Sequence, residues 1–335
     1  MDKLNTNLYE KYKLNFHDEK FRILCISDLH GVVNFDRRIL SDFHRMLDAS
    51  KPDFVFVLGD MVWNDADESA ENMHAFCDPF FGILEEREIP WAYTFGNHDS
   101  NTERPTFDRR EVYKSFEHCL NKDCPEDVYG DSNFVLPVFS EKGDDIVFNI
   151  WSVDTHDTLG RYCAEHNIPF ETKWDKECAR LPTLMGDCGN YDTLRFSQLM
   201  WYYNSSLELE KYAGHKIPGL MGMHICLPEF NNITRNPAYC YFDGIARESC
   251  GSTPINSGMF ACILDRGDVK TIVAGHDHIN DYTGKYYGIN LMYDGGFNYD
   301  GYCDDDIRGG RIIDINENDP WNVESFMLKV QDIGE

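Results

Sequence analysis

Short apolar runs alternate with longer amphipathic segments through the first hundred residues of the chain. Buried strands are predicted over 21–27, 53–58 and 90–95, where apolar side chains follow one another almost without a break. Helices are predicted over 36–49 and 68–88, because their apolar residues recur every three or four positions. Strands and helices in turn are typical of βαβ units, so these segments by themselves predict a doubly wound parallel sheet.

The remainder of the chain has a less regular pattern. Helices are predicted over 109–121, 192–212 and 258–265, and strands over 132–139, 145–153, 217–223, 269–274, 287–293, 311–315 and 323–330. The last three strands are expected to be antiparallel. We expect an N-terminal arm over 1–20 and a single domain over 21–335, with loop insertions near 155–190 and 226–257. Such long loops usually carry function, so both are predicted to form walls of a substrate site.

Composition narrows the choice of partners. The 335 residues carry a formal net charge of −27, and such a surface repels both nucleic acid and anionic membranes, so neither is expected as a partner. The N-terminus lacks the basic and apolar regions of a signal peptide, and no apolar run is long enough to span a bilayer. A cytoplasmic protein is expected, although a secreted protein without its leader would look the same. The oligomeric state stays open.

Twelve cysteines are present, and none lies in a C-x-x-C pair, which argues against a zinc ribbon or a thioredoxin-like motif. Cys25 and Cys262 lie in apolar runs and are predicted to be reduced core residues. The cysteines of 163–188 and the pair Cys240 and Cys250 fall in predicted loops. Disulfides are possible there if the protein is secreted.

Candidate chemistry lies in five short motifs, each of which directly follows a predicted strand. They are Asp28-Leu29-His30, Gly59-Asp60, Gly96-Asn97-His98-Asp99, Met223-His224 and Gly275-His276-Asp277-His278. Ligand sites form at the ends of strands in open α/β sheets. Carboxylate, imidazole and amide together suit Mn, Fe or Zn, and the glycines allow tight turns and close backbone approach.

Two metals would lie roughly 3.5–4 Å apart and would need a shared ligand, for which Asp60 is the natural candidate because a carboxylate has two oxygens. One such motif alone is weak evidence, since Asp154-Thr155-His156 repeats the Asp-x-His pattern elsewhere in the chain. Five motifs in this order, each after a strand, are far more specific. Cys226 lies close to His224 and could offer sulfur to a metal, but it is predicted to be a plain loop residue.

With these motifs the chain resembles the calcineurin-like metallophosphoesterase superfamily over about 21–300. It looks most similar to the purple-acid-phosphatase-like branch, because of the segments 275–282 and 293–297 and the pair Tyr191-Asp192. The resemblance implies an α/β (α+β) fold in four layers, in which two mixed β-sheets pack as a sandwich flanked by helices.

The resemblance also implies a ligand set for two divalent or mixed-valence transition metal ions, Mn, Fe or Zn. The first ion would be held by Asp28, His30, Asp60 and His278, and the second by Asp60, Asn97, His224 and His276. Purple members of the branch have an Asp-x-Gly first motif and a tyrosine ligand three residues after the second-motif aspartate. This chain has His30 and Trp63 at those positions, so no purple chromophore is expected.

The expected activity is hydrolysis of phosphate monoesters by attack of a metal-bridging hydroxide. His98 is expected to donate the proton to the leaving oxygen, with Asp99 orienting its ring. Asp277 and Asp281 are expected to hydrogen-bond the imidazole ligands. The substrate would be a phosphorylated small molecule or a phosphoprotein. Two alternatives remain: a phosphodiesterase acting on nucleotides or lipid head groups, and a non-enzymatic binding scaffold with this fold.

Overall fold

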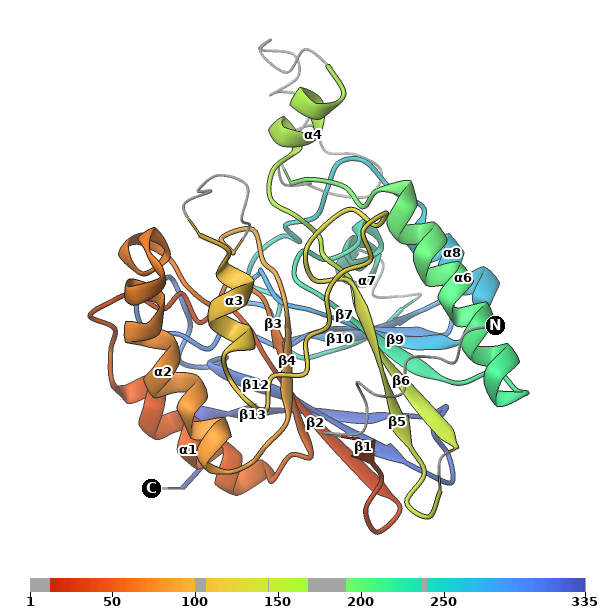
Figure 1. Cartoon of the computed structure of the whole chain (residues 1–335), viewed down its shortest axis with the longest axis horizontal. Helices are drawn as coiled ribbons and strands as arrows, with labels where there is room; N and C mark the ends of the chain where they lie inside the picture. Colours follow the sequence, from red (N-terminus) through yellow and green to blue (C-terminus); the bar gives the residue numbers. More distant parts are fainter. Residues whose placement is uncertain (1–12, 100–106, 144, 168–190, 236–239, 335) are drawn as a thin grey trace.

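Two β-sheets pack face to face, with helices on both outer faces, in the computed structural model (Figure 1). The structure describes residues 13–99, 107–143, 145–167, 191–235 and 240–334. Helices α1 (Arg38–Ser50) and α2 (Ala70–Glu86) lie on one side, and α6 (Phe196–Ala213) and α8 (Met259–Arg266) on the other. This arrangement of helix, sheet, sheet and helix confirms the four-layer fold. No helix in the described ranges is long and apolar enough to cross a membrane.

The smaller sheet has five strands in the order β13-β12-β2-β3-β4. Their bounds are β2 Lys20–Ile26, β3 Phe54–Leu58, β4 Trp91–Thr94, β12 Gly309–Asn316 and β13 Glu324–Lys329. Strands β2, β3 and β4 are parallel and are joined through α1 and α2, as the periodicity of the first hundred residues predicts. Strand β12 returns from the end of the chain and pairs with β2 in the antiparallel sense.

The larger sheet has eight strands in the order β1-β5-β6-β7-β9-β11-β10-β8. Their bounds are β1 Leu14–Asn15, β5 Phe134–Phe139, β6 Ile146–Ser152, β7 Gly219–Met223, β8 Tyr241–Asp243, β9 Val269–Ala274, β10 Thr283–Tyr286 and β11 Ile289–Tyr293. Parallel pairs such as β7·β9 stand beside antiparallel pairs such as β5·β6. A single doubly wound parallel sheet is therefore wrong, because the second half of the chain builds a sheet of its own.

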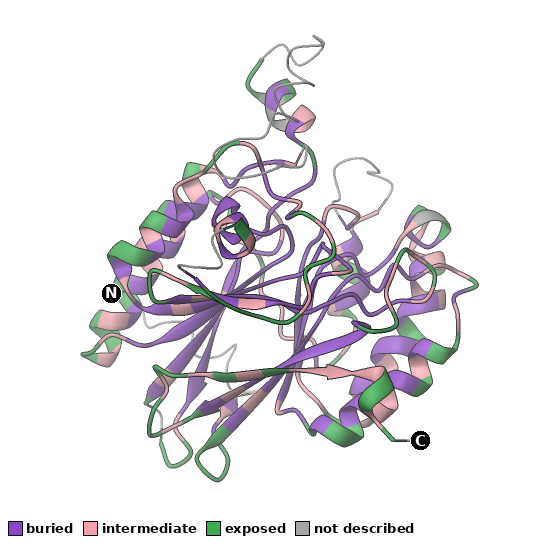
Figure 2. Cartoon of the chain, turned by 180° about the vertical axis from the view of Figure 1, so that it is seen from behind, coloured by how far each residue is buried: buried purple, intermediate pink, exposed green. Residues whose placement is uncertain are grey.

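Side chains alternate between the two faces of each strand, so the fold has three apolar interfaces. One lies between the two sheets, and one lies between each sheet and the helices that cover it. In β3, Val55 and Val57 pack toward α1 and α2, whereas Phe54, Phe56 and Leu58 pack between the two sheets. Successive side chains of a strand point to opposite faces, so a strand covered on both faces reads as one continuous apolar run. The buried colour in Figure 2 accordingly runs through both sheets and the inner sides of the helices.

The connecting regions contain more structure than predicted. Part of the predicted arm belongs to the larger sheet, because β1 pairs with β5 and Phe16 is fully buried. The strands β8 and β10 were not predicted. The other short elements are η2 Asn64–Glu68, α3 Arg109–Lys114, α4 Leu159–Glu165, η3 Pro228–Phe230, α7 Asn231–Arg235 and η4 Val330–Asp332. Residues 168–190 of the first predicted insertion lie outside the described residues.

Candidate metal centre

All five motifs meet where strands of the two sheets end side by side. The smaller sheet supplies Asp28 and His30 after β2, Asp60 after β3, and Asn97 and His98 after β4; the larger sheet supplies His224 after β7, and His276 and His278 after β9. Parallel strands end at a common edge, so polar residues that directly follow them converge. The structure thus brings together all seven predicted ligands and His98.

Several of these residues have a strained backbone. The φ angles of Asp28, His30, Asp60 and His276 are 55°, 45°, 52° and 75°. This left-handed region costs a residue with a side chain about 1–2 kcal/mol, which is why glycine is usual there. Strain of this kind concentrates at functional sites, where the surrounding structure holds a residue in a conformation that it would otherwise avoid.

Asp28, His30 and His278 form the first group of possible ligands, all of them buried. The Nε2 atom of His278 lies 3.1 Å from Oδ1 of Asp28 and 3.1 Å from Nε2 of His30. Oδ1 of Asp28 has no hydrogen-bond donor among the described residues, whereas its Oδ2 accepts from Ser27 and from the backbone amide of His276 at 2.9 Å. One carboxylate oxygen therefore faces the two imidazoles without a hydrogen bond.

Asp60, His224 and His276 form the second group, which is also buried. Nε2 of His224 lies 3.2 Å from Oδ2 of Asp60 and 3.1 Å from Oδ1 of Asn97. Nδ1 of His276 lies 3.3 Å from the same imidazole nitrogen. This group, with Asn97, corresponds to the set that the family resemblance implies for the second metal.

Asp60 connects the two groups through a single oxygen. Its Oδ2 lies 3.6 Å from Nε2 of His30 in the first group and 3.2 Å from Nε2 of His224 in the second. Its Oδ1 instead accepts the backbone amide of His98 at 2.9 Å. The structure thus turns one Asp60 oxygen toward both groups and uses the other to hold the His98 backbone, which the sequence does not indicate. The close approach also needs Gly96, because a Cβ there would lie 2.1 Å from Oδ1.

Backbone carbonyls orient the imidazoles. Nδ1 of His224 lies 2.7 Å from the carbonyl of Leu58, and Nδ1 of His278 lies 2.6 Å from that of Tyr302. Each contact turns Nε2 toward the centre, as the partners of metal-binding histidines commonly do. The expectation that Asp277 and Asp281 have this role is wrong.

Asp277 instead accepts from the backbone of Gly251 and the hydroxyl of Tyr293. Asp281 pairs with Lys329 at 2.7 Å and accepts the backbone amide of Ile245 at 2.6 Å. Both carboxylates therefore brace loops around the centre, and neither reaches an imidazole ligand.

The carboxylates of Asp28 and Asp60 favour positive charge at His278 and His224. Burial alone would lower the pKa of both His224 and His278, but Asp60 and Asp28 outweigh it and raise these pKa values to about 10 and about 9. Burial lowers the pKa of His30 to about 4 and that of His276 to about 3. Two neutral imidazoles, two carboxylates and two points that attract a cation are a donor set that suits two divalent metal ions.

His98 lies at the edge of the centre, and its side chain is 38% exposed. Its Nε2 lies 4.0 Å from Oδ2 of Asp60, and its ring contacts Trp63 and His30. The carboxylate of Asp99 is bonded to the backbone amides of Met61 and Gly96, at 3.0 and 2.9 Å. Among the described residues Asp99 thus joins the Asp60 and Asn97 loops, and we find no hydrogen bond from it to the His98 ring.

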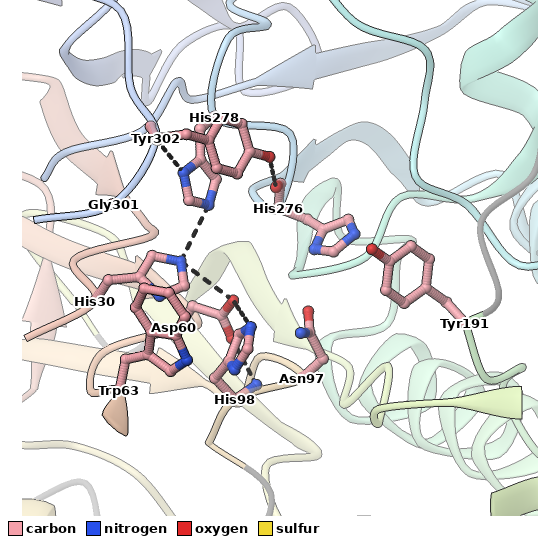
Figure 3. A pocket seen from close by; sticks show the side chains of 10 residues that line it. All are labelled: His30, Asp60, Trp63, Asn97, His98, Tyr191, His276, His278, Gly301 and Tyr302. Carbon is pink, nitrogen blue, oxygen red and sulfur yellow. Dashed lines mark hydrogen bonds and ion pairs between the residues drawn. The ribbon is translucent and has the colours of Figure 1, made fainter. Parts of the chain in front are cut away.

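A cavity of about 170 Å³ opens onto this centre (Figure 3). Three aromatic residues wall it beside the imidazoles: the ring of Tyr302 stacks on His278 at 4.0 Å, Tyr191 meets His276 edge-on at 4.3 Å, and Trp63 lies against His30. These neighbours come from three separate loops. The family resemblance draws attention to Trp63 and Tyr191 in the sequence, but their contacts with the imidazoles appear only in the structure. His156 lies elsewhere, 3.0 Å from Gln198 and against Tyr129.

Residues 21–280 match the family model described as calcineurin-like phosphoesterase. The chain belongs to this family. Among curated relatives, "probable inactive purple acid phosphatase 14" of Arabidopsis thaliana is 29% identical over 331 residues, covering 88% of this chain and 75% of the relative. "Phosphatase DCR2" of Saccharomyces cerevisiae is 26% identical over 298 residues, covering 78% of this chain and 45% of that protein.

A solved structure, a dimetal phosphatase from Danio rerio, is similar in fold, with a TM-score of 0.53 and 13% identity over 92% of this chain and 99% of that one. Together these findings confirm the calcineurin-like superfamily, its purple-acid-phosphatase-like branch and the sandwich fold. Membership supports a metal-dependent phosphoesterase. The word "inactive" in the name of the Arabidopsis relative makes turnover the property to test.

Proposed function

We propose that this chain hydrolyses phosphate monoesters with two divalent transition metal ions, Mn, Fe or Zn. One observation carries the proposal: two buried groups of imidazole and carboxylate share Asp60 in one open cavity, with His98 at its edge. Ions held there would polarise the phosphate oxygens and lower the pKa of a coordinated water. Asp28, His30, Asp60 and His278 would hold the first ion, and Asp60, Asn97, His224 and His276 the second.

His98 is proposed to donate the proton to the leaving oxygen. Its ring is half-exposed and stands beside Asp60, at the mouth of the cavity, whereas the imidazoles of the two groups are buried. Its backbone amide donates to Asp60, and this hydrogen bond holds the loop that carries the ring in place. A proton donor so placed contributes about 10²–10⁴-fold to the rate when the leaving group is a poor one.

The aromatic side chains at the cavity support a small or flat leaving group. Trp63, Tyr191 and Tyr302 line the cavity beside the imidazoles, so the leaving group would lie against these rings. Substrates are accordingly proposed to be small-molecule monoesters or phosphoproteins, not nucleic acid, since the net charge of −27 repels polyanions.

The test loads the protein with Mn²⁺ or Zn²⁺ and compares phenyl phosphate, p-nitrophenyl phosphate and bis(p-nitrophenyl) phosphate, with EDTA as the metal-free control. We expect turnover of the two monoesters and little of the diester. A preference for the diester would favour a phosphodiesterase. Two bound ions with no turnover of any ester would favour the non-enzymatic scaffold, which the naming of the Arabidopsis relatives makes the second candidate.

His98→Ala separates the proton donor from a structural role. The variant should retain both ions and lose about 10²–10⁴-fold in kcat on phenyl phosphate. It should lose much less on p-nitrophenyl phosphate, whose leaving group needs no proton. His74→Ala, at a half-exposed histidine on α2, is the matched control. Equal losses on both esters would rule out the assigned role.

A further inference from the structure

Two buried cysteines lie side by side behind the candidate metal centre. Cys226 and Cys250 are 2% and 3% exposed, and their sulfur atoms and a carboxylate oxygen of Asp277 all lie within 4.8 Å of one another. Cys226 follows His224 at the end of β7, whereas Cys250 lies in the predicted insertion 226–257. The sequence analysis allowed a disulfide at Cys240 and Cys250 in a secreted protein, and the structure places Cys226 beside Cys250.

The surroundings of this pair suit a covalent bond better than a third metal ion. The hydroxyl of Tyr293 lies 3.0 Å from the Cys226 sulfur and also hydrogen-bonds Asp277. A metal ion held by both sulfurs and the carboxylate would have to displace this hydroxyl, and Asp277 also accepts the backbone amide of Gly251 at 3.0 Å. In a disulfide the two sulfurs lie about 2 Å apart, and its formation leaves the partners of Asp277 in place.

We propose that Cys226 and Cys250 form a disulfide when the protein folds in an oxidising environment. With oxidised glutathione as the oxidant, one thiolate attacks the glutathione disulfide and releases the first reduced glutathione. The second cysteine attacks the mixed disulfide, forms the Cys226–Cys250 bond and releases the second. Two electrons and two protons pass from the protein to glutathione, so the exchange balances. Burial in the folded chain then shields the bond from reduction.

The bond would link two loops that hold the second ligand group. Cys226 lies two positions after His224. Gly251, next to Cys250, packs so closely on His276 that a Cβ there would lie 2.7 Å from the imidazole. The disulfide would therefore fasten the segment of His224 to the loop that covers His276. It should slow the opening by which these residues release a metal, and it does not depend on hydrolytic activity.

The test uses the full chain, reduced and unfolded, then refolded in a glutathione redox buffer. Peptide mapping should find Cys226 linked to Cys250, with a loss of two hydrogens in mass and two fewer alkylatable thiols than in the reduced protein. The oxidised form should unfold at a temperature a few degrees higher and release Mn²⁺ to EDTA more slowly. Cys262→Ser, in α8, is the control that should keep the link.

Three results would overturn the proposal. The first is that both thiols remain alkylatable after refolding at an oxidising potential. The second is a link from Cys250 to Cys240. The third is zinc bound in addition to the ions of the centre and lost in Cys226→Ser, which would make the same groups a metal site. If Cys226→Ser does not fold, mapping and metal analysis of the wild-type chain still decide, because neither needs the variant.

Discussion

The two sheets contribute different chemistry to the candidate centre. The smaller sheet supplies both carboxylates, the amide and one imidazole, at Asp28, Asp60, Asn97 and His30, whereas the larger sheet supplies imidazoles alone, at His224, His276 and His278. Each group of ligands draws on both sheets. Metal binding should therefore stabilise the packing of one sheet against the other. The predictions below test this division, from the largest expected effect to the smallest.

Asp60→Asn should have the largest effect, because one Asp60 oxygen lies within 3.6 Å of an imidazole nitrogen in each group. An amide keeps the shape but loses the negative charge that two cations would share. We expect metal analysis to show that the two ions of the wild type are largely lost, with activity down by about 10³-fold or more, which corresponds to about 4 kcal/mol of transition-state stabilisation. Asp48→Asn, an exposed carboxylate on α1, should change neither. Retention of both ions would exclude Asp60 as the shared ligand.

Gly96→Ala should displace Asp60, a ligand that the smaller sheet supplies, without removing any ligand side chain. Its Cβ would meet Oδ1 of Asp60 at 2.1 Å and the Asp60 backbone nitrogen at 2.5 Å, so Asp60 must move. A shift of about 1 Å in such a site can lower turnover about 10²-fold. Gly82→Ala is the control, since nothing lies within 4 Å of its Cβ, and in α2 it should stabilise the protein by up to about 1 kcal/mol. Wild-type activity in Gly96→Ala would show that activity does not need the close approach of residue 96 to Asp60.

Two matched Phe→Ala substitutions test whether packing between the sheets affects metal release beyond its effect on overall stability. Phe56→Ala removes a ring between the sheets, and Phe80→Ala removes one between α2 and the smaller sheet; both rings are fully buried. Each should cost about 3–5 kcal/mol in free energy of unfolding. Phe56→Ala should also release metal to a chelator faster than Phe80→Ala does. Equal rates at equal loss of stability would contradict the coupling between metal binding and sheet packing.

The smallest effect concerns the strained backbone of the smaller sheet. At His30, with φ of 45°, glycine should be tolerated better than alanine. We expect His30→Gly to be about 1 kcal/mol more stable than His30→Ala in urea unfolding of the metal-free protein. The matched pair removes the imidazole in both variants, so the difference reports the backbone alone. If alanine is equally stable, the turn relaxes and stores no strain.

Much of the centre could be predicted from local sequence. An apolar run such as Phe54–Leu58 predicts a buried strand. A polar residue directly after such a run lies at the edge of a sheet, whatever the rest of the fold is. For that reason the residues of all five motifs can be predicted without knowledge of any long-range contact. The alternation of strand and helix in the first hundred residues likewise describes the parallel part of the smaller sheet.

Apolar periodicity and short motifs do not predict contacts between segments that are distant in the sequence. Periodicity tells which faces of a strand are apolar, but not which sheet a strand joins, so by itself it does not indicate that the second half of the chain builds a separate sheet. Aspartates beside metal ligands suggested imidazole partners, yet Asp277 contacts Tyr293 and Asp99 contacts the backbone. These pairings depend on how loops from two sheets pack.

By itself the sequence determined which side chains stand at strand ends, because strand formation and turn geometry are set over a few residues. The tertiary structure decided what those side chains do together. It turned one oxygen of Asp60 to both groups, used the other to hold the His98 backbone, and brought Cys226 beside Cys250. Each of these contacts forms only when the two sheets pack face to face, and that packing is driven by apolar side chains that lie far from the ligands along the chain.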